Sequence, residues 1–252
     1  MSPPPLAPSL TRGVSLALRG LRLALGSAEV RRTYLRLALA LVLTALVLTA
    51  AFVSLAWWLI PVSPDMAWMA WLRNAALLLA ATVVALIAAP MLALFVVNVA
   101  FPFLADAVFM AGARAADPTL AARLEKPADV GLMASIAGSV RRLLAFVGVT
   151  LALTALSFIP VIGAVLGPVL ELWFAARTLT WELLDPYFER VGSDYDAQRQ
   201  LVTQRRATLV GYGLPWTFLM ALPVFGPLLF GLAQAGVAAL VLEDIEASQP
   251  VR

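Results

Sequence analysis

The sequence predicts an all-α integral membrane protein. We expect two long transmembrane helices, an N-terminal amphipathic helix and two half-penetrating, or re-entrant, helical hairpins. Of the 252 residues, 62% are hydrophobic and 13% are charged, whereas soluble domains carry about 25% charged residues. Too few polar side chains are present to cover a soluble core, so we expect one membrane domain over residues 10–246, a disordered start at residues 1–9 and a tail at residues 247–252.

Two missing residue types narrow the possible chemistry. The chain has no Cys and no His, which removes disulfides, thiol nucleophiles, histidine-ligated metals and Ser-His catalysis. We therefore expect no enzyme activity, no metal site and no cofactor. The net charge is +3, but the arginines are scattered at the edges of apolar segments without interleaved exposed aromatics. This pattern predicts anchoring at a membrane face and no binding of nucleic acid.

The N-terminal helix and the two spans are predicted from charge spacing. Arginines and a serine recur at steps of three and four residues between positions 12 and 22, with Leu and Val filling the other faces, which is typical of an interfacial helix. Leu37–Ile60 and Ala75–Phe101 are free of charge and exceed the about 20 residues that a span needs.

Between the two predicted spans, the loop Pro61–Asn74 holds one basic residue, Arg73. The other basic residues fall on the opposite side or, for Arg177, within a hairpin arm, so both termini are expected to be cytoplasmic.

Two further apolar segments, residues 143–184 and 207–242, are predicted to be hairpins. The arms of the first, Leu143–Ile159 and Pro168–Leu184, have 17 residues each, or about 26 Å as helix. The arms of the second reach about 22 to 24 Å, against a hydrocarbon core of about 30 Å. Arms of this length predict that both hairpins enter the bilayer and turn back within it, with their tips covered by protein or water.

The two hairpins also form an internal repeat. Each follows an Arg pair and turns at a Pro-Val-x-Gly sequence, with Pro160 and Gly163 in the first and Pro223 and Gly226 in the second. Proline is expected to set each turn, and glycine is expected to permit a positive φ angle there.

Several of these stretches resemble one known family. The resemblance runs from about Gly20 to Leu242 and is carried by Phe158–Pro168, Leu184–Phe188, the Arg205-Arg206 pair, Leu222–Pro227, Asn98 with Pro102 and Phe103, and the Arg31-Arg32 pair. In these stretches the chain resembles a divergent member of the CysZ sulfate-permease and etoposide-induced membrane-protein superfamily. The resemblance implies two full transmembrane helices and two half-penetrating hairpins. It also implies sulfate entry into the cytoplasm for bacterial members, whereas eukaryotic relatives are endoplasmic-reticulum proteins.

The resemblance further implies an anion site at the start of the first span. Here the matching residues are Gly26, Ser27, Arg31 and Arg32. Two arginines beside a helix start can hold an oxyanion by bidentate, charge-assisted hydrogen bonds; the alternative is that they anchor the chain beside lipid phosphate. The family's Pro-Gly before the pair is absent, and Glu29 stands there instead. We expect this carboxylate to oppose anion binding.

Three polar residues within apolar segments are candidates for a pathway: Asn98, Glu171 and Arg177. Charges at such depths are costly and usually functional. Glu171 and Arg177 are six residues apart and are therefore not helical neighbours. They need partners such as Asn98, Ser157 or another subunit. The alternative is a structural pair, or a side chain that reaches the interface.

Two functions fit these observations. The first is a CysZ-like permease that moves a small oxyanion such as sulfate into the cytoplasm, and the alternative is a non-transporting membrane scaffold of the same superfamily. The expected partners are the lipid bilayer, the small inorganic anion and further copies of the chain, since re-entrant tips need protein cover. The expected location is the bacterial inner (cytoplasmic) membrane, as a multi-pass protein.

Overall fold

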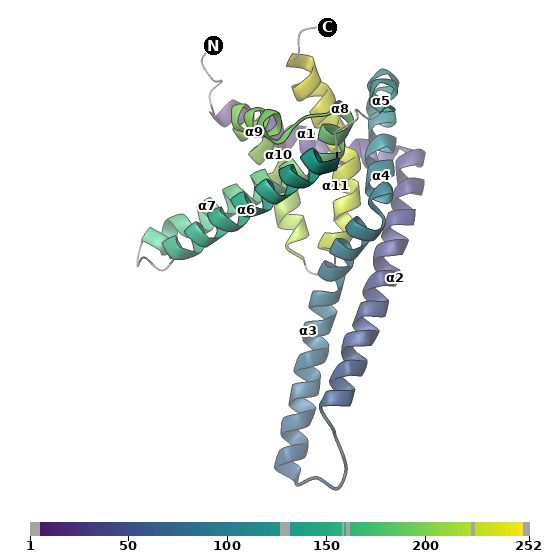
Figure 1. Ribbon diagram of the computed structural model, residues 1–252, viewed down its shortest axis with the longest axis vertical. Coiled ribbons are helices and arrows are strands. Elements are labelled where there is room, and N and C mark those ends of the chain that lie inside the picture. Colours follow the sequence, from purple (N-terminus) through teal and green to yellow (C-terminus); the bar gives the residue numbers. More distant parts are fainter. Residues whose placement is uncertain (1–5, 127–131, 158, 160–161, 223–224, 249–252) are drawn as a thin grey trace.

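A computed structural model describes residues 6–126, 132–157, 159, 162–222 and 225–248. Within these residues the protein is helical and contains no strand. A long helical hairpin, a shorter central hairpin and a third, outlying hairpin project from one end of the molecule, where the remaining helices gather (Figure 1). The all-helical prediction is confirmed for this part of the chain.

The long hairpin consists of α2 (Ala28–Leu59) and α3 (Trp68–Ala100). Their 32 and 33 residues correspond to about 48 to 50 Å, and both are long and apolar enough to cross a membrane. Both helices start before the predicted spans, because the polar residues that precede each apolar run are also helical. At the far end, Asn74 is buried, and its Nδ2 donates to the carbonyl oxygen of Pro61 at 2.8 Å.

The amphipathic N-terminal helix, α1 (Leu6–Gly26), is packed inside the protein and does not only lie on its surface. It contacts α10 (Arg206–Met220) and α11 (Gly226–Leu240) along its length. Leu16 on this face is buried. The helix begins within the segment predicted to be disordered, so residues 6–9 correct that expectation, and residues 1–5 lie outside the described part.

The central hairpin, α10 and α11, reaches the middle of the long hairpin (Figure 1). Helix α10 has 15 residues, or about 22 Å, as predicted for a short arm. Helix α11 continues into a π-helical turn, η1 (Val241–Ile245), and the combined segment of 20 residues is a third helix long and apolar enough to span. The second arm is therefore longer than expected, because the helix continues past Leu242 through the acidic residues.

The outlying hairpin consists of α6 (Leu132–Ser157) and α7 (Ile162–Leu183), and it diverges from the long hairpin (Figure 1). Its helices have 26 and 22 residues, or about 39 and 33 Å. Helix α7 begins ahead of Pro168, which lies inside it, so the turn is shorter than the predicted Pro160–Gly167 segment. The helices are longer than the predicted arms, because polar flanking residues and turn residues are also helical. Arm length alone therefore does not make this hairpin re-entrant.

The turn glycines have a different role from the predicted one. Among the described glycines, positive φ occurs at Gly192 and not at Gly163 or Gly226. A Cβ at Gly163 would lie 2.5 Å from the carbonyl oxygen of Leu156, and one at Gly226 would overlap that of Met220. Close backbone approach in the turn therefore requires both glycines. The prolines at 160 and 223 lie outside the described residues.

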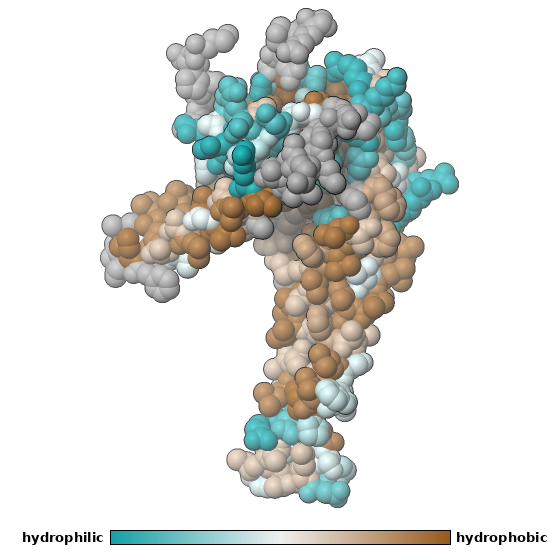
Figure 2. All heavy atoms as spheres, in the orientation of Figure 1, coloured by the Kyte–Doolittle hydropathy of each residue, from teal (hydrophilic) through white to brown (hydrophobic). Residues whose placement is uncertain are grey.

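Four short helices complete the polar end: α4 (Pro102–Ala116), α5 (Pro118–Leu124), α8 (Asp185–Val191) and α9 (Tyr195–Gln204). A 3₁₀ turn, η2 (Glu246–Ser248), follows η1. Asp117 caps α5, and hydrogen bonds from the Thr119 side chain and backbone lower the pKa of its carboxyl. Hydrophilic residues gather at this end, whereas hydrophobic residues cover much of the projecting hairpins (Figure 2).

Candidate functional site

The predicted anion site lies at the corner between α1 and α2. Helix α1 ends at Gly26, and Ser27 caps α2, its Oγ accepting a hydrogen bond from the Val30 backbone N–H at 3.3 Å. Serine is a preferred N-cap because its oxygen satisfies one of the free N–H groups of the first turn. The sequence therefore forms a sharp helix–helix corner here, with the start of α2 as an electropositive helix end.

Arg31 and Arg32 occupy the first turn of α2, and both are exposed. The Nη1 of Arg31 donates to the carbonyl oxygen of Leu25 at 2.7 Å, which holds the arginine across the corner. A guanidinium has five N–H donors, so this bond leaves Arg31 with further donors for an anion. The structure thus brings all four predicted residues, Gly26, Ser27, Arg31 and Arg32, to one corner.

Glu29 lies on the same first turn but is paired. The Nε of Arg114 on α4 lies 2.7 Å from the Glu29 carboxylate, and both side chains are substantially exposed. The expectation that this carboxylate opposes an anion stays a prediction, and the Arg114 guanidinium partly balances the charge of the carboxylate. As an exposed ion pair it adds little to stability, about 0 to 1 kcal/mol.

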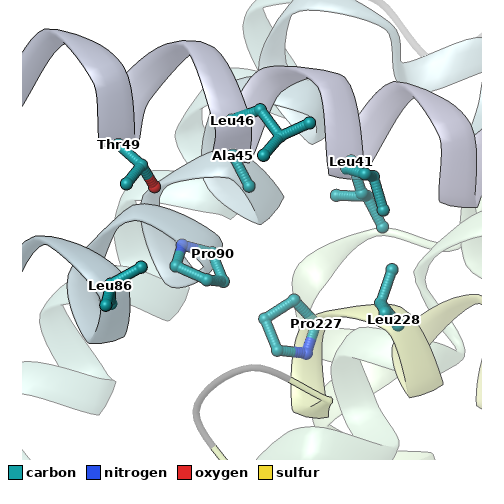
Figure 3. A pocket seen from close by; sticks show the side chains of 9 residues that line it. Leu41, Ala45, Leu46, Thr49, Leu86, Pro90, Pro227 and Leu228 are labelled. Atoms are coloured by element: carbon teal, nitrogen blue, oxygen red, sulfur yellow. The ribbon is translucent and has the colours of Figure 1, made fainter.

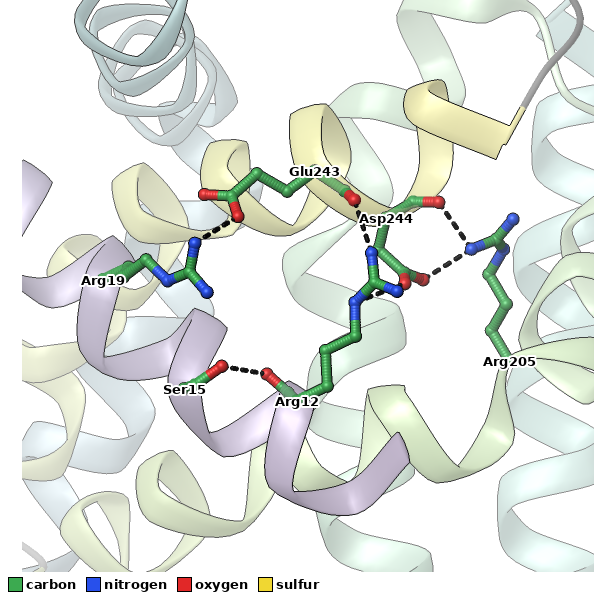
Figure 4. Close-up of polar contacts among 6 residues, drawn as sticks. All are labelled: Arg12, Ser15, Arg19, Arg205, Glu243 and Asp244. Atoms are coloured by element: carbon green, nitrogen blue, oxygen red, sulfur yellow. Dashed lines mark hydrogen bonds and ion pairs between the residues drawn. The ribbon is translucent and has the colours of Figure 1, made fainter. Parts of the chain in front are cut away.

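A second polar cluster, not predicted from the sequence, joins α1, α10 and η1 (Figure 4). Asp244 is 6% exposed, and its carboxylate lies 2.5 Å from Arg205 Nη1 and 3.4 Å from Arg12 Nε. Arg19 forms a 2.5 Å ion pair with Glu243. These contacts fix the start of the central hairpin to its end and to α1. We call Arg12, Arg19, Arg205, Glu243 and Asp244 the end network.

A third polar contact holds α8 against α4. Arg190 donates from Nε and Nη2 to the two oxygens of Asp106 at 2.9 and 2.6 Å, and from Nη1 to the Leu124 carbonyl oxygen at 2.5 Å. This is the two-pronged geometry in which arginine binds carboxylates most strongly. Sequence reasoning missed it, because 84 positions separate the partners and no local spacing signals such a pair.

The three predicted pathway residues are not brought together. Glu171 on α7 accepts a hydrogen bond of 3.3 Å from Ser157, one of the partners expected for it. Arg177 lies further along α7, and no ion pair joins it to Glu171 in the described part. Asn98 lies on α3, and no hydrogen bond between described side chains links it to α7.

A cavity lies at the tip of the central hairpin, where it meets the middle of the long hairpin (Figure 3). Its volume is about 350 Å³. Thr49 contributes one hydroxyl to an otherwise apolar lining that comprises Leu41, Val42, Ala45, Leu46, Leu86, Pro90, Pro227 and Leu228. Neither Arg31 nor Arg32 lines it, so this cavity is not the polar connection between the arginine pair and a hairpin tip that a permease requires.

The chain matches a known protein family over most of its length. Residues 16–230 match the family described as sulfate transporter CysZ/etoposide-induced protein 2.4. No curated protein sequence matches the chain. The matched region contains the α1–α2 corner, the long hairpin, the outlying hairpin and the first arm of the central one. Because it covers most of the 252 residues, the chain belongs to the CysZ/etoposide-induced protein family.

Proposed function

We propose that this protein is a membrane permease for a small oxyanion such as sulfate, which it moves into the cytoplasm. The observation that carries the proposal is the family match, together with two exposed arginines at the helix start where the resemblance implies the anion site. The family is a transporter family, and three helices within the described part of the chain are long and apolar enough to span a membrane. The substrate, the direction and the site residues are the parts of the proposal that need testing.

The chemistry at the α1–α2 corner suits a weakly held oxyanion. Arg31 is oriented by its bond to the Leu25 carbonyl oxygen, and Arg32 is exposed beside it. Backbone N–H groups at the start of α2 and the helix dipole add to the positive potential. Because the pair is open to solvent, its affinity should fall as salt concentration rises, which suits a site that must release its ion.

The proposed topology is a bacterial cytoplasmic membrane protein with the polar end and both termini in the cytoplasm. The basic residues support this orientation, since the end of the long hairpin where α2 and α3 meet carries a single basic residue, Arg73, near the start of α3. The central hairpin is proposed to be re-entrant, because its tip meets the middle of the long hairpin. A homo-oligomer is also proposed, with a second copy covering the exposed outlying hairpin.

The test is sulfate uptake into liposomes that contain the purified protein. Wild type should take up labelled sulfate, and the double variant Arg31→Ala/Arg32→Ala should lose uptake. Lysine at both positions should restore only part of it, since an ammonium keeps the charge but loses the planar fork. Arg36→Ala, an exposed arginine one to two turns along α2, is the matched control and should transport normally.

The scaffold alternative rests on a specific observation, the apolar cavity at the central tip. An apolar lining offers an oxyanion no hydrogen bonds there, and a scaffold needs no wetted pathway. If wild-type liposomes show no uptake of sulfate, sulfite or phosphate, the permease proposal fails. If uptake occurs but survives the double alanine variant, the arginine pair is an anchor and the pathway lies elsewhere.

A further inference from the structure

Arg177 on α7 is partly buried, and the described residues give it no ion pair. Its Nε is buried and makes no hydrogen bond in the described structure. A buried donor without a partner is unfavourable, and a guanidinium that merely reached solvent would have its donors hydrated. Among the described residues, six other arginines have carboxylate partners, namely Arg12, Arg19, Arg114, Arg123, Arg190 and Arg205.

Two positive charges on other helices make the position of Arg177 less favourable. Arg199 on α9 and Arg206 at the start of α10 both repel it, whereas the Tyr195 phenol is the favourable neighbour. Both of these arginines are exposed, and the described residues give neither an ion pair. The positive charges of Arg199 and Arg206 thus act on Arg177 from two other helices, and the amino end of α10 adds the positive end of a helix dipole.

The surroundings hold these elements in place. Trp181, one turn along α7 from Arg177, donates from Nε1 to Gln198 Oε1 at 3.1 Å and stacks on Tyr195 with ring centroids 6.0 Å apart. Thr180 donates to the Leu209 carbonyl oxygen at 2.8 Å, which joins α7 to α10. The three helices that carry these arginines, α7, α9 and α10, are therefore held together by specific contacts.

We propose that Arg177, Arg199 and Arg206 form a binding site for a phosphate-type oxyanion group, supplied either by a lipid headgroup or by a free ion. An anion would neutralise the mutual repulsion and accept hydrogen bonds from several guanidinium groups. Arg177 lies six residues before the end of α7 at Leu183, about 9 Å along the helix, so the site lies close to the polar end. It is separate from the α1–α2 corner and does not depend on the proposed transport function.

The experiment measures thermal unfolding of the full chain in two arms. In the first arm, protein in detergent is titrated with inorganic phosphate against chloride of equal ionic strength. In the second, protein is placed in phosphatidylcholine bilayers with and without phosphatidic acid. The variants are Arg177→Met, which keeps an apolar stem, Arg199→Gln and Arg206→Gln. Arg22→Gln, at an exposed arginine of α1, is the matched control.

The proposal expects wild type and Arg22→Gln to be stabilised by the anion in at least one arm. Each cluster variant should need at least about tenfold more anion for the same shift, because it loses a charge-assisted hydrogen bond. Stabilisation by phosphatidic acid alone identifies a lipid headgroup, and stabilisation by phosphate identifies a free ion. Without anion, Arg177→Met should unfold at a higher temperature than wild type, since it removes the repulsion.

Two results would overturn the site: no stabilisation of wild type in either arm, or equal stabilisation of wild type and all cluster variants. Should Arg177→Met not fold, the two exposed positions, Arg199 and Arg206, still decide the question. Sulfate uptake separates this site from the proposed permease, because uptake can be lost in the Arg31→Ala/Arg32→Ala variant while stabilisation by the phosphate group is kept.

Discussion

The central and outlying hairpins share one sequence pattern but occupy different environments. Both follow an Arg pair, and in both a glycine permits close backbone approach after the turn, at Gly226 and Gly163. Yet nearly all of α11 is buried, whereas most described side chains on α6 from Val140 onward are exposed. The shared pattern specifies a helical hairpin and leaves open what the hairpin packs against.

Residue size accounts for the difference. Helix α11 is rich in Gly and Ala, and Gly236 lies against the backbone of Gly20 on α1. Small residues let helix backbones approach closely, which is how helices associate in membranes. The outlying hairpin presents large apolar side chains, and at Gly148 on α6 no atom lies within 4 Å of an added Cβ. Close helix packing around the central hairpin is therefore determined by its small residues.

The largest expected effect comes from replacing a tightly packed glycine by alanine, which adds one methyl group, and comparing it with the same change at a glycine that faces open space. Gly20→Ala places a Cβ against the backbone of Gly236, 2.9 Å from its carbonyl carbon, and should destabilise the protein by about 2 to 4 kcal/mol. Gly148→Ala meets open space and should be neutral or stabilise the helix by up to about 1 kcal/mol. Denaturant titration in detergent measures both, and equal losses would contradict the size argument.

Charge removal should have the next largest effect. Asp244→Asn leaves Arg205 and Arg12 without their carboxylate, and we expect a loss of about 2 kcal/mol. This is less than for a fully buried pair, because the Arg12 side chain is 54% exposed. Glu171→Gln in the outlying hairpin should change stability by less than about 0.5 kcal/mol. Similar losses in the two variants would mean that the end network does not stabilise the central hairpin.

A smaller effect is expected where the two hairpins meet. Thr180→Val removes the hydrogen bond to the Leu209 carbonyl oxygen and should cost about 1 kcal/mol or slightly more. Thr154→Val, at an exposed threonine of α6, is the control and should lie within about 0.5 kcal/mol of wild type. The same unfolding titration applies, and a Thr180 variant as stable as the control would show that this bond does not couple the hairpins.

The last prediction concerns the depth of the two hairpin tips in the membrane and does not involve stability. The chain has no cysteine, so single cysteines at Phe225 and Leu166 report on the two tips without background. We expect both to resist membrane-impermeant thiol reagents added from the outer face, as re-entrant tips should. Ready labelling at Leu166 but not at Phe225 would show that the outlying hairpin crosses the bilayer, as its helix lengths allow, and that the central one does not.

The sequence by itself determined the class of protein, the two long apolar helices, the two hairpins and the family. These follow from composition, charge spacing and local motifs, which act over a turn or two of helix. The proximity of Gly26, Ser27, Arg31 and Arg32 also follows from the sequence, since they are neighbours in the chain. Helix ends were less well predicted, because charged residues continue helices beyond the apolar runs.

Only the tertiary structure decided which distant charges meet. Asp244 with Arg12 and Arg205, and Arg190 with Asp106, are joined across long stretches of chain, and no spacing rule predicts them. The same holds for the repulsion that Arg177 experiences from Arg199 and Arg206. The physical reason is that helix packing depends on how small residues fit together, and this fit sets the positions of the polar side chains that the helices carry.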